Sequence, residues 1–176
     1  FEQFQLWQEQ AVKAELSDPT ACVLATRQID GTLRQRMVLM KVVDTRGLVF
    51  FTNFSSAKAI AISSDHQSSM LFPWNDLDRQ VSISGVVSSI ADSESDAYFA
   101  SRPRASQLAA WASKQSQTIA SREALLIELE RVKRQFDGSE VPRPPNWGGY
   151  RLAPRYFEFW QGGRDRLHDR FCYASF

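Results

Sequence analysis

Alternating apolar and polar residues dominate the first third of the chain and predict short strands joined by tight turns. A helix is predicted first, from Gln3 to Leu16, because Phe4, Trp7 and Ala11 recur at helical spacing. The strands predicted after it are Ala21–Arg27, Leu33–Val43 and Leu48–Thr52. Asp30-Gly31 is a strong hairpin signal between the first two. Three strands joined in this way form an antiparallel meander.

Helices interrupt the strands in the middle of the chain. Asn53–Ser56 supplies residues that cap helix N-termini, so a short helix is expected directly after it. Ser93 with Asp96 resembles a capping arrangement, and Pro103 suits the first turn of another helix. The helices predicted here are Ala57–Ser63, Glu94–Ser101, Pro103 to about Ala112 and Arg122–Phe136, and the strands are Ser68–Trp74 and Arg79–Ile90.

The C-terminal part returns to strands. A proline-rich loop over Val141–Gly149 precedes a long aromatic strand, Tyr150–Trp160, and Arg164–Tyr173 is expected to pair back on it. About seven strands in hairpins with inserted helices predict an α+β protein, built on a small antiparallel barrel of six to eight strands with flanking helices. The length of 176 residues fits a single domain that spans residues 1–176.

Cationic side chains gather in the last predicted strand. The two-residue period of a strand puts Arg164, Arg166, His168 and Arg170 on one face. Such groups repel one another, and Arg binds phosphate in a bidentate way, so one interpretation is an anion site. The other is a solvated edge strand whose charges keep other strands away. The pattern alone favours neither.

The composition indicates that any binding function depends on local groups of residues and not on the overall charge of the protein. The net charge is +1, from 21 basic and 20 acidic residues, which provides no overall field for binding nucleic acid. Cys22 and Cys172 have neither metal-ligand spacing nor the density of a disulfide scaffold, so two reduced thiols are expected. No apolar run approaches the ~20 residues of a membrane span, and no signal peptide is evident. We therefore expect a soluble, cytoplasmic protein.

Two segments in the strand-rich half could bind an anion. Arg36 and Lys41 lie five residues apart in one strand and point to opposite faces, so they can serve one pocket only through a bulge or across a subunit boundary. The alternative is two charges that reach solvent from the barrel ends. In Thr52–Lys58 a strand enters a helix start, where free amides and Lys58 could bind a phosphate. Simple capping by Ser55 or Ser56 explains that segment equally well.

A third candidate set lies in the helical part. Tyr98, Arg102 and Ser106 are four residues apart in succession and would share a face of a continuous helix. Two hydroxyl groups around a guanidinium could bind a phosphate dianion. Pro103, however, requires a break or kink at this point.

The remaining polar residues give weaker signals. Gln115 in the polar Lys114–Ser116 loop, together with Gln80, could hydrogen-bond the rim of a heterocycle or simply be solvated. His66 lies in a polar turn, which leaves His168 as the imidazole of interest. No Cys/His metal set, P-loop or GxGxxG motif is present, and neither Cys has a local His partner, which disfavours a thiol nucleophile.

Five ordered segments resemble the pyridoxamine 5′-phosphate oxidase family. They are Arg36–Lys41, Phe51–Lys58, Leu71–Trp74, Ser101–Gln107 and Trp160–Phe171. Because they run in order from near the first helix to about Tyr173, the resemblance is more specific than any one cluster. It implies an FMN-binding split-barrel homodimer with two flavins at the subunit interface. Walls contributed by different chains would account for the opposed Arg36 and Lys41.

The resemblance also implies roles for individual residues. The FMN phosphate and ribityl chain would contact Arg36, Lys58, Gln115 and Ser116. The rest of the flavin site would include Met37, Val38, Leu39, Lys41, Phe51, Thr52, Gln80, Trp160 and Arg170. The substrate phosphate would be held by Lys41, Tyr98, Arg102 and Ser106. Arg166 and His168 would lie over the substrate's pyridine ring as its catalytic residues, and no metal is implied.

The implied activity is oxidation of pyridoxine or pyridoxamine 5′-phosphate by dioxygen to pyridoxal 5′-phosphate, in vitamin B6 synthesis and salvage. Peroxide is the second product, and the amine also releases ammonia. Two alternatives remain: a non-catalytic carrier of flavin or pyridoxal phosphate, and a related split-barrel flavin reductase. A carrier would have no use for the substrate-side residues Tyr98, Arg102, Ser106, Arg166 and His168.

The sequence departs from the family pattern at two residues. Ala57 stands where relatives usually have Arg, which removes one charge-assisted phosphate contact worth roughly 1.5–3 kcal/mol. Phe51 stands where Tyr is common. Relatives also continue past the position of Phe176 into a closing strand. The first departure predicts weakened FMN binding.

Overall fold

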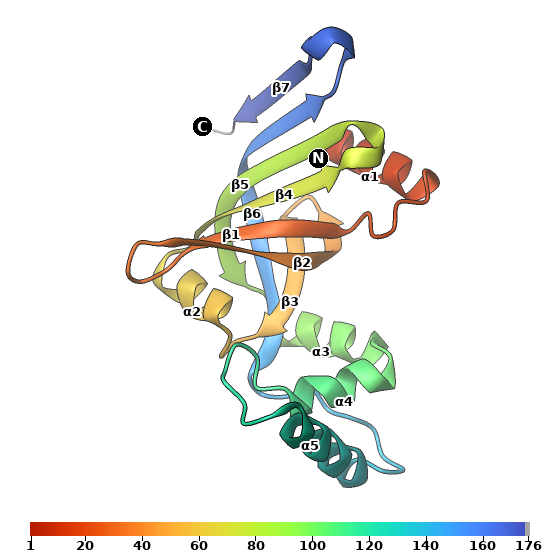
Figure 1. Ribbon diagram of the computed structural model, residues 1–176, viewed down its shortest axis with the longest axis vertical. Helices are drawn as coiled ribbons and strands as arrows, with labels where there is room; N and C mark the ends of the chain where they lie inside the picture. The colour runs from red at the N-terminus through yellow and green to blue at the C-terminus, as the bar shows by residue number, and fades with distance from the viewer. Residues whose placement is uncertain (175–176) are drawn as a thin grey trace. The chain divides into compact units, whose positions relative to one another are not determined.

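A computed structural model describes residues 1–174, which form two compact units (Figure 1). Unit 1 comprises residues 1–50, 61–88 and those from 150 on, and unit 2 comprises residues 51–60 and 89–149. The length predicted a single domain, and a single domain would unfold both units in one cooperative transition. That the two units form a single domain stays a prediction.

Unit 1 is built on an antiparallel barrel. The strands of the described chain are β1 (Ala21–Arg27), β2 (Leu33–Asp44), β3 (Gly47–Asn53), β4 (Gln67–Trp74), β5 (Arg79–Ser89), β6 (Trp147–Gln161) and β7 (Asp169–Ala174). Their order in the sheet is β3-β2-β1-β4-β5-β6-β7, and a further β3–β6 pairing closes the first six into a barrel. The predicted six- to eight-stranded split barrel is therefore confirmed, with β7 left at an edge.

The barrel core follows directly from the strand alternation. Along β1 and β5 every second residue is buried, which is the period-2 pattern that the sequence showed. Helix α1 (Glu2–Lys13) adds Phe4 and Trp7 to this core. The Phe4 ring lies 5.0 Å from Phe72 and the Trp7 ring 5.3 Å from Phe159, both edge to face. Aromatic pairs of this kind stabilise packing beyond their buried area.

Unit 2 has a core of its own, made mainly by helices. It contains the start of α2 (Ala57–Ser64) and all of α3 (Asp92–Ser101), α4 (Arg104–Ala112) and α5 (Arg122–Gln135), the last three gathered together in Figure 1. Ser121 caps α5, since its hydroxyl accepts the Ala124 N–H at 3.1 Å. The core residues are Phe99, Leu108, Ala112, Val132, Phe136, Val141 and Trp147.

Several element ends differ from the predictions. Helix α1 ends at Lys13 and not at Leu16, because Glu15 adopts a left-handed φ of 55°. Helix α3 begins at Asp92 after Ala91, which makes no side-chain cap, so the proposed capping role of Ser93 was wrong. Pro103 is the N-cap of α4. The first residues of β6 occupy what was predicted to be the end of the proline-rich loop.

The largest error concerns the cationic strip. Arg164–Arg166 form a 3-10 turn (η2) in which Asp165 and Arg166 have φ of 55° and 62°, and β7 starts only at Asp169. The alternation that placed Arg164, Arg166 and His168 on one strand face was therefore wrong. A Cβ at Gly163 would lie 1.9 Å from the Leu167 carbonyl oxygen, so the tight turn requires glycine here. A second 3-10 turn (η1, Asn75–Leu77) joins β4 to β5.

Candidate ligand-binding site

A buried lysine surrounded by hydroxyl groups lies in unit 2 at the end of β3. Lys58 is only 7% exposed. Its Nζ donates to Thr52 Oγ1 at 3.1 Å and to Ser56 Oγ at 3.4 Å. Thr52 Oγ1 in turn donates to Gln115 Oε1 at 2.9 Å, and the Asn53 N–H also reaches that oxygen, at 3.3 Å. Lys58 and Gln115, predicted for the phosphate end of FMN, are thus brought together with Thr52, which was predicted for the rest of the flavin site and lies 63 positions before Gln115.

This Lys58 cluster, made of Thr52, Ser56, Lys58 and Gln115, has the donor chemistry of a phosphate site. A buried ammonium is costly unless it is paired or hydrogen-bonded, and it is strongly stabilised by an anion. Ser56 was considered only as a helix cap; its hydroxyl does accept the Ala59 N–H at 3.4 Å, but it also faces Lys58. Ser116, beside Gln115, is exposed with φ of 66°.

A second cationic site in unit 2 is centred on Arg102. The guanidinium carbon lies 4.8 Å from the Trp147 ring centroid and 5.5 Å from that of Phe99. Arg102 Nη1 is buried and has no hydrogen-bond partner among the described residues. Because buried polar groups are nearly always hydrogen-bonded, such a donor indicates a place for an acceptor that the chain itself does not supply.

Tyr98 belongs to the same site. Burial lowers the pKa of Arg102, while the nearby Tyr98 works in the opposite direction. Burial raises the pKa of Tyr98, whereas the charge of Arg102 acts to lower it. The structure therefore brings these two predicted residues together, with the hydroxyl protonated at neutral pH. Ser106 lies in the first turn of α4. It is separated from Arg102 by the helix break at Pro103, which the sequence predicted.

Arg36 lies in unit 1 and is anchored to the neighbouring strand. Its Nη1 donates to Thr26 Oγ1 at 2.7 Å and to the Leu24 carbonyl at 3.1 Å. Burial lowers the pKa of this guanidinium, with a further contribution from Arg34. Thr26, which is itself 1% exposed, was not among the predicted site residues. Nothing local in the sequence marks it, since its role comes from the β1–β2 register.

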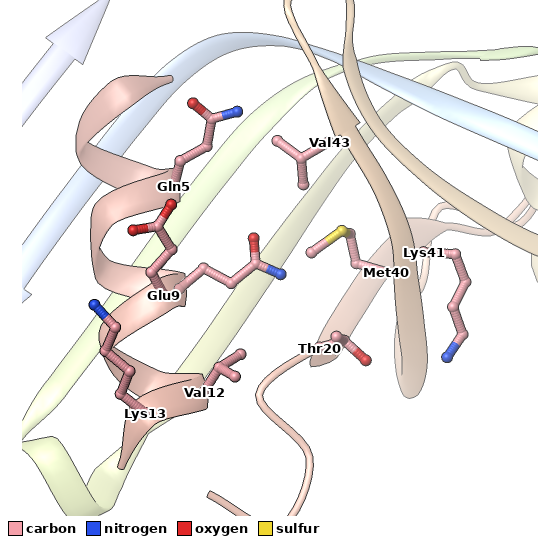
Figure 2. Close-up of a pocket in the computed structure, with 9 residues that line it drawn as sticks. Gln5, Glu9, Val12, Lys13, Thr20, Met40, Lys41 and Val43 are labelled. Carbon is pink, nitrogen blue, oxygen red and sulfur yellow. The ribbon is translucent and has the colours of Figure 1, made fainter. Parts of the chain in front are cut away.

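Lys41 lies at an irregularity of β2 and is more exposed than Arg36. Arg36 is half-buried whereas Lys41 is exposed, and the register of β2 against β3 shifts between Met40 and Val42. Lys41 borders a groove of about 580 Å³, with α1 on its other side (Figure 2). Figure 2 shows Gln5 and Glu9 on α1 and, across from them, Met40 and Val43 on β2. Both polar and apolar side chains line the groove.

Four further predicted residues lie in the C-terminal hairpin: Trp160, Arg166, His168 and Arg170. The Trp160 ring lies 4.6 Å from that of His168, and Nδ1 of His168 accepts the Gly163 N–H at 3.1 Å. This bond leaves the proton of the neutral imidazole on Nε2. Arg170 pairs with Trp160 across the ladder and lies 3.7 Å from Glu158. Arg166 is exposed in η2.

The predicted residues that remain are placed as follows. Gln80 is half-buried in β5, opposite Pro73. In β2, Met37 and Leu39 are exposed, while Val38 packs against the unit 1 core. Phe51 stacks on Tyr98 with ring centroids 3.8 Å apart. Within residues 1–174 no group of His, Cys, Asp and Glu is arranged to hold a metal ion, and no helix is long and apolar enough to cross a membrane.

By its architecture the chain is a split-barrel protein. Residues 8–136 match the family described as pyridoxamine 5′-phosphate oxidase, and residues 147–175 match the pyridoxine 5′-phosphate oxidase C-terminal dimerisation region. The chain belongs to the pyridoxamine 5′-phosphate oxidase family. It is 49% identical over 172 residues to the pyridoxine/pyridoxamine 5′-phosphate oxidase of Cyanothece sp., which covers 98% of this chain and 81% of that protein.

Solved structures agree with this assignment. PhzG from Burkholderia lata 383, solved in complex with tetrahydrophenazine-1-carboxylic acid, superposes with a TM-score of 0.95 at 32% identity, over 99% of this chain and 86% of that one. A pyridoxamine 5′-phosphate oxidase-related, FMN-binding protein from Nostoc punctiforme gives 0.65 at 16% identity, over 89% and 88% of the two chains. The latter likeness concerns the fold alone.

Proposed function

We propose that this chain, as an FMN-containing homodimer, oxidises pyridoxine 5′-phosphate and pyridoxamine 5′-phosphate to pyridoxal 5′-phosphate. The alcohol and dioxygen give the aldehyde and hydrogen peroxide. The amine, dioxygen and water give the aldehyde, ammonia and hydrogen peroxide. The observation that carries the proposal is the buried Arg102 Nη1, which lacks a partner among the described residues and lies beside Tyr98.

The Lys58 cluster is the proposed site of the FMN phosphate. Lys58 supplies the charge, and Thr52 and Gln115 supply neutral hydrogen-bonding groups around it. Arg36 and Ser116 are proposed to contact the phosphate and ribityl chain as well. The remaining residues proposed to line the flavin are Met37, Val38, Leu39, Lys41, Phe51, Gln80, Trp160 and Arg170. When bound, FMN supplies the two-electron acceptor that dioxygen regenerates.

The substrate-side residues are proposed to hold and orient the phosphorylated ring. Arg102 would pair with the substrate phosphate, helped by Tyr98, Ser106 and Lys41, because a guanidinium and hydroxyl groups together satisfy the oxygens of a dianion. The phosphate lies far from the reacting carbon, so the free energy of binding it serves to orient that carbon for the reaction. Arg166 is proposed to stack on the pyridine face, and His168 to orient the substrate or relay a proton through Nε2.

Homodimer formation is supported by apolar surface in unit 1. On β2, Met37, Leu39 and Val42 are exposed, and on the edge strand β7 so are Phe171 and Tyr173. Rows of exposed apolar side chains on strands are characteristic of association surfaces. Cys22 and Cys172 are free cysteines, one buried and one exposed. A cytoplasmic location is proposed for the protein.

The test is to purify the protein, measure its flavin content and follow aldehyde formation. We expect turnover of pyridoxine 5′-phosphate that depends on FMN and yields one peroxide per aldehyde. A yellow protein that forms no aldehyde would support the carrier alternative. Flavin reduction by a nicotinamide, without oxidation of either vitamer phosphate, would support the reductase alternative.

A further inference from the structure

The aromatic residues beneath Arg102 have no assigned role. Trp147 is 6% exposed and opens β6, directly before two glycines. Its ring is nearly parallel to those of Phe51 and Tyr98, with interplanar angles of 9° and 4°, while Phe51 and Tyr98 are themselves stacked at 3.8 Å. The same Trp147 ring faces the Arg102 guanidinium. The Trp147 ring therefore contacts Arg102 and lies parallel to Tyr98, and both of these residues are proposed to bind the substrate phosphate.

We propose that Trp147 is a positioning residue for the substrate phosphate, acting directly on Arg102 and through Phe51 on Tyr98. This inference rests on the proposed function. An Arg side chain has several rotatable bonds, and Arg102 Nη1 has no hydrogen bond to hold it within the described residues. A cation–π contact with Trp, the aromatic residue that makes the strongest such contacts, fixes the plane of the guanidinium before the ligand arrives. Preorganisation of this kind reduces the entropy lost on binding.

The backbone next to Trp147 is shaped to keep this stack in place. A Cβ on Gly149 would lie 2.9 Å from Phe51 Cε1 and closer still to the Ile90 side chain. A Cβ on Gly148 would lie 3.0 Å from Phe54 Cε2. Arg143 also donates to the Trp147 carbonyl at 2.6 Å while pairing with Asp96. The Trp147 N–H also donates to the Pro144 carbonyl at 3.0 Å, so hydrogen bonds hold both sides of the Trp147 backbone.

A purely structural role for Trp147 makes a different prediction. A core residue should affect stability without distinguishing ligands that differ only in the phosphate. The experiment therefore measures equilibrium binding of 4-deoxypyridoxine 5′-phosphate and of 4-deoxypyridoxine to the FMN-loaded protein. Neither probe carries the oxidisable hydroxyl, so turnover does not interfere. The ratio of the two Kd values reports the phosphate contribution alone.

We expect Trp147→Leu to weaken binding of the phosphorylated probe by about 2- to 30-fold, the range of a partly to fully desolvated cation–π contact. Binding of the unphosphorylated probe should not change, and Trp147→Phe should recover most of the loss. Arg102→Leu should remove most of the preference, and adding Trp147→Leu to it should cost less than it does in the wild-type protein, because only the path through Phe51 and Tyr98 then remains. Trp111→Leu is the matched control: its ring packs on Phe136, 5.2 Å away, in the same core.

The outcomes separate the two proposals. A wild-type protein that does not prefer the phosphorylated probe would refute the proposed function. A wild-type preference that Trp147→Leu leaves unchanged, or effects of Trp147→Leu and Arg102→Leu that simply add, would refute the positioning role alone. If Trp147→Leu does not fold, Phe51→Leu removes the stack on Tyr98 and leaves the Trp147–Arg102 contact. It should then reduce the preference by a smaller factor, and an unchanged preference would again refute the role.

Discussion

Replacing Lys58 by Met tests the proposed FMN phosphate site most sharply. The substitution keeps an unbranched stem of similar length in a buried position and removes the charge. Its two hydroxyl acceptors retain other partners, since Thr52 Oγ1 still donates to Gln115 and Ser56 Oγ still accepts the Ala59 N–H. We therefore expect the FMN-free protein to keep its free energy of unfolding within about 1 kcal/mol.

FMN binding should respond much more strongly. A hydrogen bond to a charged group is worth roughly 1.5–3 kcal/mol, so losing it should raise the Kd for FMN by about 10- to 150-fold. The loss should be large because Ala57 already lacks the cation that relatives usually carry there. Fluorescence quenching on titration of the FMN-free protein with FMN measures this Kd.

Two comparisons make the result interpretable. Lys133→Met removes an exposed lysine that pairs with Glu130 on α5, and it should leave the Kd unchanged. Riboflavin, which lacks the phosphate, should bind wild type and Lys58→Met equally. An unchanged Kd for FMN in Lys58→Met, or an equal loss for riboflavin, would refute the assignment of the cluster.

Three further predictions concern unit 1. Gly85→Ala should destabilise it by about 3 kcal/mol or more, seen as a lower thermal midpoint, because the new Cβ would lie 2.0 Å from the Ala153 carbonyl oxygen; an unchanged midpoint would contradict the packing. Burial acts to raise the pKa of Asp44, but hydrogen bonds from Arg46 and Arg151 outweigh it and lower that pKa to about 2. Because this pKa is lowered, ionised Asp44 stabilises the fold at pH values above the ordinary Asp pKa, and the stabilisation is lost as the pH falls toward 2. The free energy of unfolding of Asp44→Asn should therefore change less than that of the wild-type protein between about pH 4 and 2. Parallel changes in the two proteins would contradict the lowered pKa. Burial raises the pKa of the Cys22 thiol to about 12, so Cys172→Ser protein should have no reactive thiol at pH 8 until it is unfolded, whereas rapid alkylation of the native variant would show that Cys22 is accessible.

The strands were predictable because their signals are local. Ala21–Arg27 was predicted with its observed ends, since a period-2 apolar pattern followed by Asp-Gly leaves little choice. The end of α1 was missed because nothing in the residue type of Glu15 announces its left-handed φ. The alternating charges after Gly163 imitate a strand, yet the glycine allows a 3-10 turn that the side-chain pattern does not reveal.

The site divides in the same way. Thr52 and Lys58 lie six residues apart at a strand–helix junction and could be proposed from local sequence. Gln115 joins them only through the fold, and Trp147 meets Arg102 from 45 residues further along the chain. Such pairs depend on tertiary packing, which local periodicity does not encode. The family resemblance supplied Gln115 in advance, whereas Trp147 became visible only in the structure.

The most direct test of the central claim is a single anaerobic turnover. FMN-loaded protein mixed with one equivalent of pyridoxine 5′-phosphate in the absence of dioxygen should lose its flavin absorbance and form one equivalent of pyridoxal 5′-phosphate. Admitting dioxygen should restore the absorbance with release of one equivalent of peroxide. Retained flavin absorbance and no aldehyde, from protein shown to bind the vitamer phosphate, would contradict the account.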